Sequence, residues 1–266
     1  MSDAADVSFT TRGYIQGEDA LTDLRISSGS YTLIMRGDVM DPGMPGAGVF
    51  VGTLTNSESA GLEDVLRESK KYPGFTPAPL IDKYVRAFYA KGEKLAKLDA
   101  SINLSTGDGR LIVDVTLKNS GRERICLKSP STWEGHYNPM SGSSFVRISA
   151  IRKGTNGKGL GQSFRTREFG GSNMIPMSND PGAEICIPSM QEHAVRFWAF
   201  PDGEIKSGTY SVGASFVIRD VLEPKELSDG LEFFAINKEI VIPRDYPSTP
   251  EETRAFAAYL KTHAQE

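Results

Sequence analysis

Apolar residues in the first part of the chain form two short runs that are rich in β-forming side chains. These runs are Tyr31–Met35 and Gly48–Leu54, and both are predicted strands. The glycine- and proline-dense segment between them is a predicted loop. Two helices should follow, one that begins after Thr55 and one over residues 79–97, because apolar residues recur there at helical spacing. Residues 1–98 are therefore expected to form a small α/β domain.

Further along the chain the pattern changes to period-two alternation, which is typical of strands with one buried face. The clearest examples are Leu111–Leu117 and Tyr210–Ile218. Other short strand-like runs, separated by turn residues, are Ser101–Leu104, Arg124–Leu127, Ser144–Arg152, Ala183–Ile187, Ala194–Phe200, Leu231–Ile236 and Glu239–Ile242. Many short strands at this spacing indicate an antiparallel β-sandwich over residues 99–245.

A helix-capping sequence precedes the last predicted helix. Thr249 can cap this helix, Pro250 suits its first turn, and Glu252 stands where a capping box needs an acidic residue. The helix is expected to end near His263, so residues 246–266 form a separate C-terminal segment.

Composition and charge narrow the range of functions. The 266 residues carry 30 Lys and Arg against 34 Asp and Glu, a net charge of −4, which disfavours a nucleic-acid binder because such proteins show a basic surplus. No apolar run is long enough for a membrane-spanning helix. The net charges of residues 1–70, 71–129, 130–200 and 201–266 are −6, +5, +2 and −5. These segments either compensate one another within the fold or form an acidic face that steers a basic protein partner.

The chain has two cysteines, 60 residues apart, in strand-like segments. Cys126 stands in Arg-Ile-Cys-Leu and Cys186 in Glu-Ile-Cys-Ile, and two cysteines are too few for a cysteine-rich zinc site. Two buried thiols are the favoured interpretation, because the cytosol keeps thiols reduced. The alternatives are a disulfide between the sheets of a sandwich and a nucleophilic role.

The chemically densest stretch of the sequence is Trp133-Glu-Gly-His-Tyr137. Its four functional side chains are candidate partner-binding residues, because Trp and Tyr dominate the energetics of protein interfaces. They are Trp133, Glu134, His136 and Tyr137. The structural alternative is that Trp133 covers the end of the core and the other three lie on the surface.

The sequence lacks the motifs of metal, cofactor and hydrolase sites. Its three histidines form no local pair with metal-ligand spacing. The glycine-rich stretch Gly154–Gly161 differs from a phosphate loop, because Lys158 is followed by Gly159 and by no helical pattern; a hairpin loop is predicted there. No serine stands in a Gly-x-Ser-x-Gly motif. We therefore predict no cofactor, no metal and no catalytic residue.

The segment Lys206-Ser-Gly-Thr-Tyr-Ser-Val212 resembles a signature found late in immunoglobulin-like sandwiches. In that fold the tyrosine side chain bonds back to the preceding corner. Gly208 and Tyr210 match the signature, and Val212 stands where antibody domains place a cysteine. The resemblance covers about residues 99–243 and implies a fold only. The predicted fold class is α+β, with a small N-terminal α/β unit, an antiparallel immunoglobulin-like β-sandwich and a C-terminal helix.

The layout of the whole chain resembles that of the bacterial immunity proteins that neutralise antibacterial effectors. The shared features are an acidic chain without a recognisable signal sequence and a small α/β unit before a sandwich. The resemblance implies a non-enzymatic protein-binding function, most concretely an immunity or inhibitor protein whose partner is a basic toxin. The expected compartment is the cytoplasm, or the periplasm if the natural chain carries a signal peptide that is removed.

Two other functions stay open at this point. The first is an enzyme or small-ligand protein with its site near Trp133–Tyr137, assisted by Arg147 or Arg152. The second is a structural subunit that assembles through exposed sheet edges.

Overall fold

The structure is a computed structural model. It describes residues 7–15, 18–27, 29–36, 46–69, 71, 78–107, 110–130, 133, 144–154, 161–168, 184–201 and 204–263. Most of these residues belong to antiparallel sheets, and three α-helices accompany them, one at the C-terminal end. The α+β fold class is therefore confirmed.

Eleven of the described strands form one continuous antiparallel sheet. In spatial order they are β1 (Val7–Ile15), β2 (Glu18–Ser27), β3 (Ser30–Met35), β4 (Ala47–Thr53), β5 (Glu93–Gly107), β6 (Arg110–Asn119), β11 (Glu192–Pro201), β9 (Gly161–Glu168), β8 (Phe145–Arg152), β12 (Gly208–Ile218) and β14 (Leu231–Ile242). A second sheet of three short strands has the order β10 (Glu184–Ile187), β7 (Ile125–Lys128) and β13 (Val221–Glu223). The short 3-10 helix η2 (Lys225–Leu227) follows β13.

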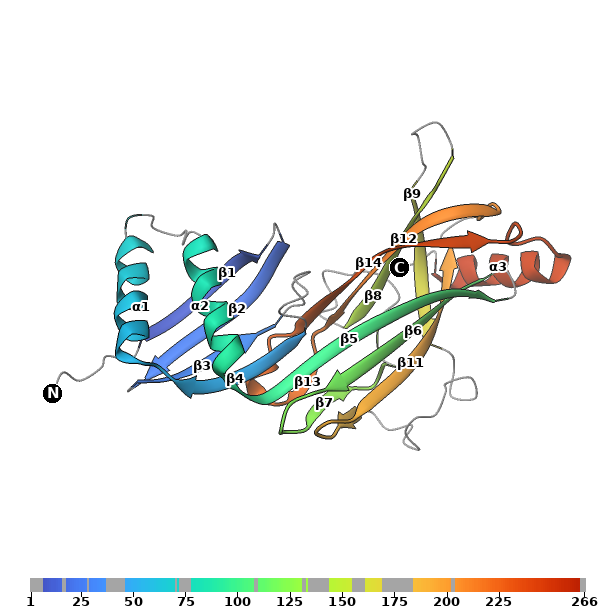
Figure 1. The fold of residues 1–266 in the computed structure, drawn as a ribbon. Helices are drawn as coiled ribbons and strands as arrows, with labels where there is room; N and C mark the ends of the chain where they lie inside the picture. Colours follow the sequence, from blue (N-terminus) through green and yellow to red (C-terminus); the bar gives the residue numbers. More distant parts are fainter. Residues whose placement is uncertain are drawn as a thin grey trace.

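The molecule is elongated, with the N-terminal strands and two helices at one end (Figure 1). The helices are α1 (Asn56–Ser69) and α2 (Ala78–Lys91), and α2 contacts β1, β3 and β4. The ring of Tyr31 stacks on Phe88 of α2 with centroids 4.5 Å apart, and its hydroxyl donates to the Phe88 carbonyl at 3.2 Å. The predicted strands of this region correspond to β3 and β4.

The capping box before α1 is confirmed. Thr55 Oγ1 accepts a hydrogen bond from the Glu58 amide at 3.3 Å, and Glu58 Oε2 accepts one from the Thr55 amide at 2.8 Å. The same carboxylate pairs with Lys91 at the end of α2, so it joins the two helices. The Lys91 ammonium and the two hydrogen bonds from Thr55 lower the pKa of Glu58 to about 2.

The helix predicted over 79–97 is too long. It ends at Lys91, and β5 begins at Glu93. Gly92 lies between them, where its amide donates to the Phe88 carbonyl and a Cβ would lie 2.9 Å from that oxygen. The backbone therefore turns where only glycine fits, and Leu95 belongs to a strand rather than to the helical stripe.

The boundary predicted at residue 98 falls inside β5. The first part of this strand pairs with β4, up to Leu98 opposite Ala47, and the part from Leu98 to Gly107 pairs with β6. One long strand therefore connects the N-terminal strands to the β-rich part (Figure 1).

The β-rich part curls until its last strand, β14, faces β5. Lys238 Nζ of β14 bonds Asn103 Oδ1 at 2.9 Å and the Leu104 carbonyl at 3.3 Å. The curled sheet and the small sheet enclose a common core, which gives a sandwich-like arrangement. The period-two prediction for this core is confirmed, because alternate residues of β6 are buried. These residues are Leu111, Val113, Val115 and Leu117.

The corner before β12 has the hydrogen bond that the sequence signature implies. The buried Tyr210 donates its hydroxyl to the Lys206 carbonyl at 2.6 Å. Asp245 accepts the Ser207 amide at 2.8 Å and the Lys206 ammonium at 3.1 Å. Arg152 donates to the Ser207 carbonyl at 2.6 Å. We call these five residues the tyrosine corner.

The C-terminal helix is confirmed as α3 (Pro250–His263). Thr249 Oγ1 accepts the Glu252 amide at 3.2 Å, as the capping sequence predicts. Phe256 is buried and meets Tyr246 edge-on at 6.0 Å between centroids. In Figure 1, α1 and α3 lie at opposite ends of the molecule.

Candidate partner-binding surface

Trp133 is the one member of the predicted binding stretch that the structure describes. Glu134, His136 and Tyr137 lie outside the described residues. The Trp133 side chain is half-buried and packs against the core, and its ring stacks on Phe197 with centroids 6.1 Å apart. Its indole Nε1 donates to the carbonyl of Lys128, the last residue of β7, at 3.3 Å. Trp133 therefore covers part of the core, as the structural alternative states, and its indole lies beside the end of β7.

The two cysteines are joined in a disulfide, so the favoured interpretation of two buried thiols is wrong. Cys126 of β7 and Cys186 of β10 stand directly opposite each other in the small sheet, with their Cα atoms 4.1 Å apart. The bond joins neighbouring strands of one sheet rather than two facing sheets. The sequence could not show this, because the pairing of two strands 60 residues apart leaves no local pattern.

The small sheet has an inward and an outward face because side chains alternate along β7 and β10, while a register shift between Val221 and Glu223 of β13 places Glu223 opposite Cys126. Its inward side chains are buried in the common core and are Ile125, Leu127, Ile185, Ile187 and Val221. Its outward side chains, together with Arg124 just before β7, form a surface that we call the disulfide face. This face consists of Arg124, Cys126, Lys128, Glu184, Cys186 and Glu223.

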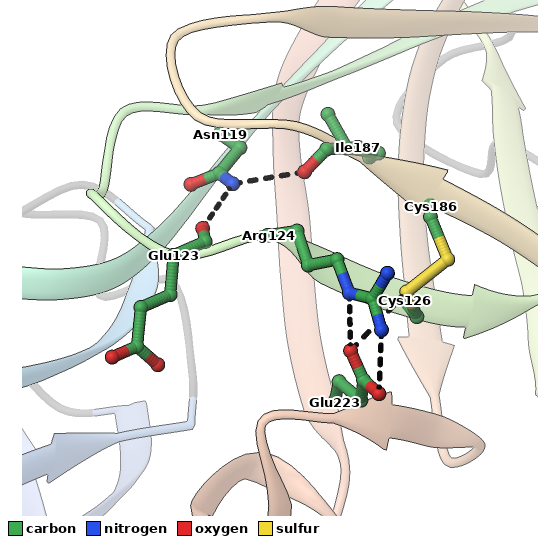
Figure 2. Close-up of a disulfide and its surroundings, with 7 residues drawn as sticks. All are labelled: Asn119, Glu123, Arg124, Cys126, Cys186, Ile187 and Glu223. Carbon is green, nitrogen blue, oxygen red and sulfur yellow. Dashed lines mark hydrogen bonds and ion pairs between the residues drawn. A yellow bond between two sulfur atoms is a disulfide. The ribbon is translucent and has the colours of Figure 1, made fainter.

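Charges of both signs lie side by side on the disulfide face. Arg124 forms a two-pronged ion pair with Glu223, with Nε–Oε2 at 2.6 Å and Nη2–Oε1 at 3.0 Å (Figure 2). The guanidinium lowers the pKa of the Glu223 carboxyl. Lys128 pairs with Asp220 at 3.0 Å, and Glu184 is exposed opposite Lys128 on the neighbouring strand. The face thus presents a fixed pattern of alternating charge.

Hydrogen bonds hold the backbone next to this face. Asn119, which is fully buried, donates from its amide nitrogen to the Ile187 carbonyl at 2.9 Å and to the Glu123 carbonyl at 2.7 Å (Figure 2). Ser189 donates to the Gly121 carbonyl at 2.7 Å. Because these bonds tie the end of β10 to the turn before β7, the two strands are held together independently of the disulfide.

Arg147 and Arg152, which the sequence offers as candidate site residues, and His193 belong to the eleven-stranded sheet rather than to the disulfide face. Arg152 belongs to the tyrosine corner, and Arg147 is exposed on β8. His193 of β11 is buried, and this burial lowers the pKa of its imidazole, so the neutral ring is favoured. His193 therefore lies beneath the surface, whereas Arg152 is partly exposed.

The exposed acidic side chains of α1 and α3 lie on different parts of the molecule. Exposed acidic residues of α1 include Glu63 and Asp64, whereas those of α3 include Glu251. These helices lie at opposite ends of the molecule (Figure 1).

Within the described ranges, no group of three or more His, Cys, Asp or Glu side chains is arranged to hold a metal ion. Each helix in that part of the chain is too short or too polar to cross a bilayer. Comparisons with protein-family models, with curated proteins and with solved structures found no match for this chain.

Proposed function

We propose that this protein binds another protein through the disulfide face, as an inhibitor that neutralises a cognate toxin or effector. The observation that carries the proposal is the construction of this face. It combines outward charges of both signs, a layer of buried apolar side chains beneath them and a disulfide that joins β7 to β10.

A surface that is already ordered loses little conformational entropy when it binds, so more of the contact energy appears as affinity. The ion pair between Arg124 and Glu223 holds a positive and a negative group at defined positions on the disulfide face. Such a pattern selects a complementary partner and suppresses others. The indole of Trp133 donates to the carbonyl of Lys128, the last residue of β7, whose side chain belongs to the same face.

The disulfide also changes the expected compartment. The cytoplasm is expected from the lack of a recognisable signal sequence, whereas a cross-linked pair of cysteines is typical of an oxidising compartment. We place the protein in an oxidising compartment outside the cytoplasm, of which the bacterial periplasm is one, and propose that its toxin partner is met there. Alkylation of free thiols in cells, before lysis, tests this placement. We expect Cys126 and Cys186 to be protected, and labelling of both would contradict this placement.

A charge-swap experiment tests the binding surface. In the variant Arg124→Glu/Glu223→Arg the ion pair is kept, but its direction is reversed. The matched control is Lys153→Glu/Glu239→Lys, because this second exposed ion pair links the end of β8 to β14 on a different surface. Immobilised protein is exposed to an extract of the native host, and the retained proteins are quantified.

We expect one protein to be retained stoichiometrically by the wild type and by the control variant. Its affinity for the Arg124/Glu223 variant should fall at least about tenfold, because like charges would then face each other across the interface. Retention of no stoichiometric protein, or equal retention by both variants, would overturn the proposal.

A further inference from the structure

The two sulfurs of the disulfide have different surroundings. Cys126 is 3% exposed, whereas Cys186 is exposed to solvent. The difference follows from strand order, because β7 lies between β10 and β13, while β10 is an edge of the small sheet. On its second flank, Cys126 stands opposite Glu223 of β13.

The Arg124–Glu223 ion pair covers the Cys126 side of the bond. Glu223 Oε2 lies 3.7 Å from Cys126 Sγ, and the same oxygen accepts the Arg124 Nε hydrogen bond at 2.6 Å. Figure 2 shows these side chains gathered around Cys126, with Cys186 on the other side of the sulfur–sulfur bond.

We propose that Cys126–Cys186 is a redox modification site that opens in the folded protein, and that Cys186 is the sulfur attacked by an incoming thiol. A thiolate attacks a disulfide sulfur in line with the bond that breaks, so the attacked sulfur must be accessible from its outer side. Only the Cys186 side meets this condition. The inference does not depend on the binding of a protein partner.

The exchange proceeds in two steps. The incoming thiolate forms a bond to Cys186 Sγ, the bond between the two cysteines breaks, and Cys126 Sγ leaves as a thiolate that takes a proton from water. A second thiol then attacks the sulfur of the first reagent in the mixed disulfide and releases Cys186 as a thiol. Two thiols of the reductant, or one dithiol, are oxidised to a disulfide while the protein gains two electrons and two protons.

The fold can accept this reaction without unfolding. After the bond opens, β10 is still paired with β7 over four residues, and Asn119 still holds the Ile187 carbonyl. Reduction therefore leaves the strands in place and exposes a thiol at Cys186 on the disulfide face. A mixed disulfide there would place a new group among the charged side chains of this face.

Reduction kinetics of the wild-type protein test the inference. The folded protein is treated with reduced glutathione, the reaction is quenched with acid, and the adducts are mapped by mass spectrometry. We expect a rate proportional to glutathione concentration, unchanged by low denaturant, and glutathione attached to Cys186 at least about tenfold more often than to Cys126. A rate that is independent of thiol concentration and accelerated by denaturant would show that the bond opens only after unfolding. Adducts mainly on Cys126 would show that the thiol attacks Cys126 rather than Cys186. Either result overturns the inference.

Two single-cysteine variants give a second measurement. Cys126→Ser leaves the thiol of Cys186, and Cys186→Ser leaves that of Cys126. In the native state a chromogenic aromatic disulfide should react at least about tenfold faster with the Cys186 thiol, while in denaturant the two rates should become similar. Equal rates in the native state would contradict the difference in accessibility.

Discussion

The tyrosine corner and the disulfide face both tie one strand to its surroundings, but they differ in what solvent can reach. At the corner, Tyr210 is 1% exposed and its hydroxyl is held by the Lys206 carbonyl. On the disulfide face, one partner of the cross-link, Cys186, is exposed. The hydrogen bond of Tyr210 is therefore closed to solvent, whereas the cross-link is open to reagents at Cys186. The predictions that follow separate these two roles.

The largest effect is expected at the corner. Tyr210→Ala removes a fully buried ring and should lower the free energy of unfolding by about 3–5 kcal/mol. Tyr210→Phe removes only the hydroxyl and leaves the Lys206 carbonyl without this donor, so a loss of about 1–2 kcal/mol is expected. Chemical denaturation measures both. If Tyr210→Phe is as stable as the wild type, the corner bond contributes nothing to stability.

Removal of the cross-link should have a smaller effect than Tyr210→Ala. Cys126→Ala/Cys186→Ala is expected to cost about 2–4 kcal/mol, because the unfolded chain loses the constraint on a loop of 60 residues. The hydrogen bonds of Asn119 should keep the native fold in this variant. Denaturation of the wild type with and without dithiothreitol provides the control, and it should show a loss of the same size. A loss in the variant that reduction does not reproduce would mean that the alanines disturb packing.

Acid should weaken the corner but leave the cross-link intact. Hydrogen bonds from the Ser207 amide and the Lys206 ammonium lower the pKa of Asp245 from an ordinary value of 3.8 to about 2. The lowered pKa means that the folded state favours the carboxylate. Its stabilising contribution is therefore complete above about pH 4 and is lost as the pH falls through about 2.

The variant Asp245→Asn tests this pH dependence. It should be less stable than the wild type at neutral pH, and the difference should shrink as the pH falls below 4. Unfolding curves between pH 2 and 7 measure the difference. A stability difference that stays constant across this range would contradict the assigned role of Asp245.

The smallest effect on stability is expected on the disulfide face. Arg124→Glu/Glu223→Arg keeps an ion pair between exposed side chains, and exposed pairs contribute little. The unfolding midpoint should therefore match that of the Lys153→Glu/Glu239→Lys control. A clear loss in the first variant alone would show that the ion pair supports the small sheet, and the binding experiment would then need a milder substitution.

The same contrast explains what could be predicted from sequence. Gly208 and Tyr210 form a local motif, so the corner bond was predicted correctly. The alternation around Val113 and the capping box of Glu58 are also local, and both are confirmed. The pairing of Cys126 with Cys186 depends on the register of distant strands, so the sequence offers a disulfide only as an alternative to two thiols. Likewise, the apolar residue Leu95 fits helical spacing, but the turn at Gly92 assigns it to β5.

The N-terminal strands show a further limit of the sequence pattern. Residues 7–15 and 18–27 form β1 and β2, although charged residues and glycine interrupt any alternation there. β1 pairs with β2, and β2 pairs with β3, and these ladders provide the backbone hydrogen bonds that make both segments strands. The charged residues Arg124 and Glu223 of the disulfide face come from distant segments of the chain and share no sequence pattern.

Side-chain footprinting of the complex tests most directly whether the disulfide face is the binding surface. The captured partner is mixed with the protein, exposed side chains are labelled with hydroxyl radicals, and the modified peptides are compared with those of the free protein. We predict protection on the peptides that contain Lys128, Trp133 and Glu223, with unchanged labelling at Ile151 and Val241, which are exposed on β8 and β14. Protection at Ile151 and Val241, with the disulfide face labelled as in the free protein, would contradict the account.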